Sequence, residues 1–178
     1  MVRGRSARQT GRMPTLELLR PDHAEAVLAF ERANRAYFAR SIPDRGDAYF
    51  AEFPARHAAL LAEQAEGTCR FHVIRGADGE LVGRVNLVDL ADGSAELGYR
   101  VAESATGRGV ARTAVAEVCR LAATAYGLTA LTAVTTVDNL ASRAVLAHNG
   151  FRFRYEFLFG DRPALSYRRS LADLRPSA

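Results

Sequence analysis

The chain has 178 residues, of which 48% are hydrophobic and 25% charged, and its formal net charge is +4. A chain of this length forms one domain whose core is large enough to fold without disulfides. All 24 basic residues are arginine, which excludes Walker phosphate-binding loops, protein kinases and Schiff-base enzymes, because each of these needs a lysine.

The first twelve residues carry four arginines and no acidic residue. We expect a disordered basic leader over residues 1–12 and a single domain over residues 13–178, with Met13 as a candidate for the native start. Subtracting the four leader charges from +4 leaves a neutral body, so we expect no nucleic-acid partner. No apolar run reaches the roughly 18 residues that span a bilayer and no signal peptide is present, so we expect no membrane association and a cytoplasmic location.

Apolar periodicity predicts one strand and two long helices at the start of the body. The strand covers residues 16–19, the first helix covers 22–38 with Asp22 as its cap, and the second helix covers 47–64. Three strands without intervening helices follow, over residues 70–75, 81–90 and 95–101. Asp-Gly pairs separate them at 78–79 and 92–93, and such pairs favour tight hairpin turns, so an antiparallel meander is predicted.

The C-terminal part alternates helices and strands: a helix over 109–126, a strand over 128–137, a helix over 140–149, and strands over 152–159 and 164–169. The whole order predicts an α/β (α+β) fold with a mixed, largely antiparallel sheet. It does not match a doubly wound Rossmann fold, because the meander has no helices between its strands.

A glycine-bearing turn opens the helix over 109–126. Gly107 and Gly109 remove two Cβ atoms where a ligand would approach the backbone, and Arg108 and Arg112 can contact phosphate oxygens. Free N–H groups and the positive end of the helix dipole favour a phosphate at such a turn. The alternative is an ordinary flexible loop with solvated arginines.

The two cysteines and four histidines carry no recognisable chemistry. Cys69 and Cys119 have no CxxC spacing, so we interpret them as buried small hydrophobic residues in a reducing compartment. The histidines, at positions 23, 57, 72 and 148, show no ligand spacing, so we expect no metal.

Four motifs stand in order along the second half: Glu-Leu-Gly-Tyr at 96–99, the turn at 106–111, Asp-Asn at 138–139 followed by Ser142, and Gly-Phe at 150–151. On these motifs the region 81–167 resembles the GNAT superfamily of acetyl-coenzyme A-dependent N-acetyltransferases, particularly its RimJ/RimL-type branch. The resemblance implies the GNAT fold, with about seven strands flanked by four helices and a V-shaped splay between the fourth and fifth strands. It also implies acetyl-coenzyme A (acetyl-CoA) as cosubstrate.

The resemblance further implies a set of cofactor-binding residues around the turn and the splay: Val101, Gly107, Arg108, Gly109, Val110, Ala111, Arg112 and Asn139. Two positions depart from the family pattern. Thr106 stands where relatives carry Gln or Arg, which puts that phosphate contact in doubt. Leu146 stands where many relatives carry a tyrosine that protonates the departing thiolate, which leaves Ser142 as the nearest hydroxyl.

Two residues are candidates for catalysis. Glu96 can act as the base that deprotonates the amine, since Gly98 on the same strand face leaves room for close approach; the alternative is a carboxylate paired with Arg84 or Arg100. Ser142 can hydrogen-bond the departing thiolate; the alternative is that it is only the third residue of a helix capped by Asn139.

Acceptor residues are less well defined. Tyr37, Phe38 and Tyr49 could line the pocket for the amine, or they belong to the core, and Glu156 could bind a cationic acceptor. The predicted function is transfer of an acetyl group to a primary amine, either a peptide N-terminus or an amino-acid-like small molecule. Alternatives are a noncatalytic acyl-CoA-binding module, or acetylation of an aminoglycoside or polyamine. A homodimer is one option for the assembly.

Overall fold

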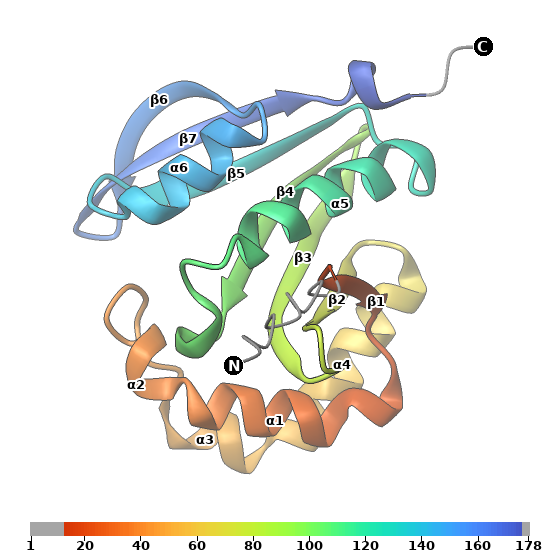
Figure 1. Cartoon of the computed structure of the whole chain (residues 1–178), viewed down its shortest axis with the longest axis vertical. Coiled ribbons are helices and arrows are strands. Elements are labelled where there is room, and N and C mark those ends of the chain that lie inside the picture. Colours follow the sequence, from red (N-terminus) through yellow and green to blue (C-terminus); the bar gives the residue numbers. More distant parts are fainter. Residues whose placement is uncertain (1–12, 176–178) are drawn as a thin grey trace, which may run out of the picture.

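Seven strands form one sheet in the computed structural model, which describes residues 13–175 (Figure 1). The strand order is β1-β2-β3-β4-β5-β7-β6, and every neighbouring pair is antiparallel except β4 and β5. The strands are β1 Thr15–Leu18, β2 Arg70–Arg75, β3 Leu81–Ala91, β4 Ser94–Val101, β5 Ala130–Thr136, β6 Arg152–Phe159 and β7 Arg162–Ser170. This is the mixed, largely antiparallel sheet that the sequence predicts.

Within the described part of the chain, six α-helices lie over the two faces of this sheet (Figure 1): α1 Ala24–Ala33, α2 Arg35–Phe38, α3 Gly46–Ala51, α4 Phe53–Glu66, α5 Val110–Thr124 and α6 Leu140–His148. Alternate residues of a strand point to opposite faces, and two hydrophobic clusters form accordingly. One cluster joins β2 to α1, α3 and α4 through Val27, Tyr49, Phe53, Phe71 and Val73. The larger cluster, which includes Val85, Leu97, Val115, Val118 and Leu131, packs α5 onto the opposite face.

The antiparallel meander of β2, β3 and β4 is confirmed. Asp92 and Gly93 both have positive φ angles, of 49° and 72°, in the turn between β3 and β4. Two consecutive positive φ values are the requirement of a type I′ turn, whose twist matches that of the strands it joins.

The prediction of one helix over residues 22–38 is wrong, because the helix is interrupted at Asn34. The Asn34 side chain donates a hydrogen bond to the carbonyl of Phe30 at 2.9 Å and accepts one from the backbone N–H of Glu103 at 3.0 Å. Asp22 does not cap the helix either; it pairs with Arg20 at 3.0 Å beside a 3-10 turn, Pro21–His23.

The predicted helix over 47–64 is likewise two helices, divided at Glu52. Pro54 lies in the first turn of α4, where a missing N–H costs nothing, whereas it could not continue α3. These two interruptions turn the four expected helices into six.

Pairing between β4 and β5 stops halfway along both strands. It joins Ser94–Leu97 to Ala130–Ala133, yet β4 continues to Val101 and β5 to Thr136. Beyond that point β4 stays paired with β3 and β5 with β7, and the two strands diverge (Figure 1). The predicted splay between the fourth and fifth strands is therefore confirmed.

The remaining predictions concern the chain as a whole. Residues 1–12, the predicted leader, lie outside the described residues. Over residues 13–175, no helix has both the length and the apolar character that crossing a membrane requires, and the same stretch contains no cluster of three or more potential metal ligands. Cys69 and Cys119 are free and buried, as predicted, and burial raises the pKa of the Cys119 thiol to about 11.

Candidate active site

A cavity of about 370 Å³ lies where β4 and β5 diverge, and residues from both faces of the sheet line it. On the side of α5 and α6 the lining residues are Tyr99, Val101, Thr106, Ala111, Asn139, Ala141, Ser142 and Val145. On the side of α1 and α2 they are Tyr37, Phe38, Ser41, Ile42, Arg84, Asn86, Gly98 and Arg100. We call these two parts the helix-α5 side and the helix-α1 side of the cavity.

The strand β4 supplies residues to both sides because its side chains alternate. Tyr99 and Val101 belong to the helix-α5 side, whereas Gly98 and Arg100 belong to the helix-α1 side. A Cβ atom added to Gly98 would meet no atom within 4 Å. The absence of a side chain at Gly98 therefore leaves open space at the point where the two strands part.

The glycine turn leads into α5 next to the helix-α5 side. Gly107 and Gly109 have φ angles of 72° and 76°, in the left-handed region that other residues avoid. Within the described part of the chain, no backbone N–H from Gly107 to Arg112 donates a hydrogen bond to a carbonyl. These N–H groups, at the positive end of a 15-residue helix, are a suitable site for a phosphate or diphosphate.

The predicted cofactor residues divide into two groups. Val101, Ala111 and Asn139 line the cavity. The other five, Gly107, Arg108, Gly109, Val110 and Arg112, lie on the adjoining turn and the first turn of α5 without lining it. Thr106, which departs from the family pattern, has a local contact instead. Its hydroxyl donates to the carbonyl of Glu103 at 2.7 Å.

Ser142 lies at the start of α6 and also lines the cavity. Its backbone N–H donates to Oδ1 of Asn139 at 3.1 Å, so Asn139 is the N-cap of α6. Its hydroxyl lines the cavity and lies 2.9 Å from the hydroxyl of Tyr99. The structure thus adds Tyr99, which sequence reasoning did not assign to the site although it belongs to the motif at 96–99.

Burial raises the pKa of Tyr99, and the hydrogen bond to Ser142 offsets only part of that effect. Tyr99 is therefore protonated at neutral pH. One of the two hydroxyl protons lies in the bond between them, and the other can be donated to a negative charge that develops in the cavity.

Glu96 lies on the helix-α1 face of β4, opposite Val88 of β3 and Thr132 of β5. Its side chain is exposed and does not line the cavity. The flanking strands still remove part of its solvent, which raises its pKa, and the charge of Asp89 raises it further. The alternative pairing of Glu96 with Arg84 or Arg100 is not present, since both arginines bind Glu31 of α1, each at 3.1 Å.

Of the four predicted acceptor residues, two line the cavity and two do not. Tyr37 and Phe38 line the helix-α1 side of the cavity. Tyr49 is only 7% exposed and packs in the core, with its ring 5.9 Å from that of Phe53. Glu156 is exposed on the edge strand β6 and does not line the cavity.

Three polar strand residues on the helix-α1 side were missed by sequence reasoning, namely Arg84, Asn86 and Arg100. Each lies on a strand, in a pattern that does not distinguish a cavity wall from a solvated face. Asn86 lies directly opposite Gly98, and its Oδ1 is buried without a hydrogen-bond partner among the described residues.

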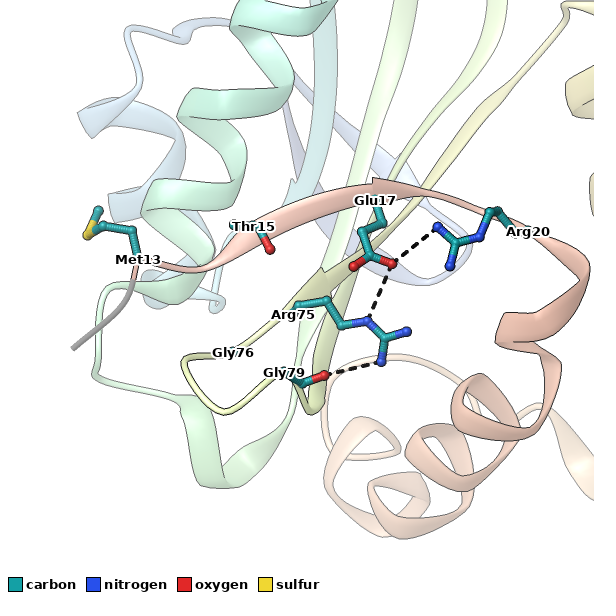
Figure 2. Close-up of a pocket in the computed structure, with 7 residues that line it drawn as sticks. All are labelled: Met13, Thr15, Glu17, Arg20, Arg75, Gly76 and Gly79. Carbon is teal, nitrogen blue, oxygen red and sulfur yellow. Dashed lines mark hydrogen bonds and ion pairs between the residues drawn. The ribbon is translucent and has the colours of Figure 1, made fainter.

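A second depression, of about 400 Å³, lies beside the edge strand β1 (Figure 2). Glu17 at its centre contacts Arg20 at 3.6 Å and Arg75 at 3.5 Å, and Arg75 donates to the carbonyl of Gly79. Its charged groups are therefore already paired with one another. Because no sequence-predicted site residue lines it, the cavity between β4 and β5 is the candidate active site.

Known proteins resemble this chain in family and in fold. The family model described as "Acetyltransferase (GNAT) domain" matches residues 15–152. A comparison with curated protein sequences gave no significant match.

Three solved structures illustrate the similarity. The ribosomal-protein-S5-alanine acetyltransferase from Vibrio fischeri is 20% identical, with a TM-score of 0.82 over 93% of this chain and 97% of that chain. RimJ from Mycobacterium smegmatis, in complex with CoA-disulfide, is 30% identical, with a TM-score of 0.81 over 93% of this chain and 85% of that chain. A spermidine N-acetyltransferase SpeG chimera from Vibrio cholerae and hSSAT is 16% identical, with a TM-score of 0.74 over 92% and 98% of the two chains.

The conformation of the glycine turn makes a prediction about binding. In Gly107→Ala, a Cβ atom at a positive φ strains the turn and moves its N–H groups, so we expect the affinity for coenzyme A to fall by roughly tenfold or more. Isothermal titration calorimetry measures this. Gly127→Ala is the matched control, because Gly127 has a φ of 68° and open space around it, on the loop between α5 and β5. Both variants should lose about 1 kcal/mol of stability; equal losses of affinity would contradict a role for the turn.

Proposed function

Since the chain belongs to the GNAT acetyltransferase domain family, we propose that its cavity transfers an acetyl group from acetyl-CoA to the primary amine of a peptide N-terminus or an amino-acid-like small molecule. One observation carries the proposal. A single cavity is lined from both faces of the sheet, beside unbonded N–H groups on one face and with an open glycine position on the other.

The helix-α5 side is suited to the cofactor. The N–H groups of the turn would hold the diphosphate, with Arg108 and Arg112 adding charge from the exposed surface. An extended arm that contains amides can then hydrogen-bond to the edge of β4 between Gly98 and Val101, which β5 does not occupy. This places the thioester near Gly98, at the opening toward the helix-α1 side.

The reaction needs a proton taken from the amine and a stabilised thiolate. We assign the first role to Glu96, acting directly or through water, because it lies two residues from Gly98 on the same face. We assign the second to Ser142, with Tyr99 holding its hydroxyl. A thiol has a pKa near 8.5, so a hydrogen bond to the departing thiolate suffices and a strong acid is not required.

The nature of the acceptor is supported by the similar structures. They include an acetyltransferase named for an alanine of a ribosomal protein and one named for spermidine, so this fold serves peptide amines as well as polyamines. We favour the peptide or amino-acid-like amine for this chain because its motifs resemble the RimJ/RimL-type branch of ribosomal-protein N-terminal acetyltransferases. RimJ, at 30% identity, is also more similar in sequence than the spermidine enzyme. A cytoplasmic location is part of this proposal, and the two free, buried cysteines suit a reducing compartment.

Release of free thiol from acetyl-CoA tests the function directly. With a panel of peptides, amino acids, aminoglycosides and polyamines, we expect thiol release that depends on an amine and mass spectrometry that shows an acetylated product. A protein that is stabilised by acetyl-CoA against thermal unfolding, yet releases no thiol with any amine, would be a noncatalytic binding module.

The role of Glu96 predicts a pH dependence. A base works only when it is deprotonated, and the pKa of Glu96 is raised, so activity should rise as pH increases through that raised pKa. Glu96→Gln should retain coenzyme A affinity, lose this rise, and turn over roughly tenfold more slowly at neutral pH. Burial is the larger cause of that raised pKa and the charge of Asp89 the smaller one, so Asp89→Asn should move the rise slightly to lower pH without abolishing turnover. Unchanged profiles for both variants would exclude Glu96 as the base.

A homodimer is also part of our proposal, with β6 as the contact. This strand is an edge of the sheet, and its large apolar side chains are exposed: Phe153 57%, Tyr155 57%, Leu158 70% and Phe159 66%. A second copy could pair with the free edge and cover these side chains.

The dimer is tested by sedimentation or light scattering at micromolar concentration. We expect a dimer for the native chain and a monomer for Tyr155→Glu, because a buried unpaired charge opposes association. Leu18→Glu places the same charge on β1 at the opposite edge, where Leu18 is 42% exposed, and should remain dimeric. A monomeric native chain would refute the proposal.

A further inference from the structure

The helix-α1 side of the cavity is lined by two guanidinium groups and by no carboxylate. Arg84 reaches it from β3 and Arg100 from β4, and none of the sixteen lining residues is Asp or Glu. Arginine is rarely buried without a matching partner. We call the surface formed by Arg84 and Arg100 the arginine wall. Its charge affects which acceptor amines can bind in the cavity.

Glu31 lies behind the two arginines and compensates only one of them. Its Oε1 contacts Nη1 of Arg84 at 3.1 Å and its Oε2 contacts Nη1 of Arg100 at 3.1 Å. The side chains of Glu31 and Arg84 are 2% and 4% exposed, and that of Arg100 is 21% exposed. Nε of Arg84 is buried without a hydrogen-bond partner among the described residues. One carboxylate and two guanidinium groups leave a net positive charge at this wall.

The other charged groups near the wall do not cancel this charge. Glu96, the proposed base on the same face of β4, is exposed and does not line the cavity, so its charge is screened by solvent. Burial lowers the pKa of Arg100, and the nearby charges of Arg45 and Arg84 oppose the effect of Glu31. At the rim, Glu103 is paired with Arg40 at 3.2 Å and Asp138 with Arg162 at 3.0 Å, and all four of these side chains are at least 43% exposed. Their carboxylates are therefore occupied and screened by solvent.

Arg100 is held in place relative to the point of reaction. Its guanidinium lies over the ring of Phe38, 5.0 Å from the ring centre. It follows Gly98 by two residues on the same face of β4, a separation of roughly 7 Å in an extended strand. That separation is between backbone positions, and both residues line the helix-α1 side, so an amine near Gly98 would share that side of the cavity with the Arg100 guanidinium.

We propose that Arg100 and Arg84 select acceptors that carry a carboxylate about one residue from the reacting amine, so that a peptide with an acidic second residue is preferred to a polycation. The inference rests on the proposed function and specifies its acceptor. A guanidinium binds a carboxylate through charge-assisted hydrogen bonds, whereas a polyamine or aminoglycoside would bring further positive charges against the same wall.

The test compares three peptides that differ only at the second position, Ala-Glu-Ala-Ala, Ala-Gln-Ala-Ala and Ala-Lys-Ala-Ala, each amidated at its C-terminus, together with spermidine. We expect kcat/KM to fall in the order Glu, Gln, Lys, with roughly tenfold between the first and the last through KM, and to be lowest for spermidine. Equal values for the three peptides would overturn the inference and leave the acetyltransferase function standing. Absence of turnover with every amine would overturn both.

Arg100→Gln identifies the residue responsible. It leaves the pair of Arg84 and Glu31 balanced, so the fold should persist, and the preference for the glutamate peptide should shrink to about threefold or less. The KM for acetyl-CoA should not change. Arg32→Gln removes the same charge from the exposed face of α1, where Arg32 makes no ion pair among the described residues, and should keep the native preference. A preference that survives in Arg100→Gln would overturn the assignment.

Discussion

The active-site architecture depends on one interruption of hydrogen bonding, the end of the parallel ladder between β4 and β5 after Leu97 and Ala133. Beyond it each strand keeps its outer partner. Val101 is still paired with Gly83 of β3, and Thr136 with Ala164 of β7. Two rows of inner backbone groups are thus left facing a gap, and unpaired backbone groups inside a protein are costly unless water or a ligand satisfies them. The gap is therefore suited to an extended ligand that carries its own amide groups.

The alternation of side chains along β4 converts this gap into a site with two functions. Tyr99 turns toward α6 and meets the hydroxyl of Ser142, 43 residues later in the chain, while Gly98 and Arg100 face the opposite side. In the proposed function, cofactor chemistry and acceptor recognition are consequently separated by one residue step of a single strand. A β-strand imposes this division, whereas successive residues of a helix would point only about 100° apart.

Sequence patterns predicted the elements whose cause is local. The Asp-Gly turns, the glycine turn before α5, and the N-cap at Asn139 each depend on neighbouring residues, and each is present. Two of the features that were missed depend on distant contacts, whereas the break beside Pro54 and the pairing of Asp22 with Arg20 are local. The helix interruption at Asn34 is stabilised by the backbone of Glu103, 69 residues away.

The arginine wall was also missed because it depends on contacts that are distant in sequence. Arg84 and Arg100 both pair with Glu31, which is 53 and 69 residues away in sequence. Glu96 is closer to both in sequence but pairs with neither. From the sequence alone the strand residues fit an exposed face equally well, because alternation shows which residues share a face but not what covers it.

Helix α1 connects both halves of the site through these distant contacts. Glu31 binds the wall formed by β3 and β4, and Asn34, three residues on, binds the backbone at Glu103, just before the glycine turn. A buried network of this kind is not required for stability, since well-packed apolar residues of similar volume stabilise a core at least as well. Apolar residues could not, however, provide a positively charged wall at a fixed distance from the reacting amine. The function of the site, rather than the stability of the fold, is therefore the better explanation for three charged side chains between α1 and the sheet.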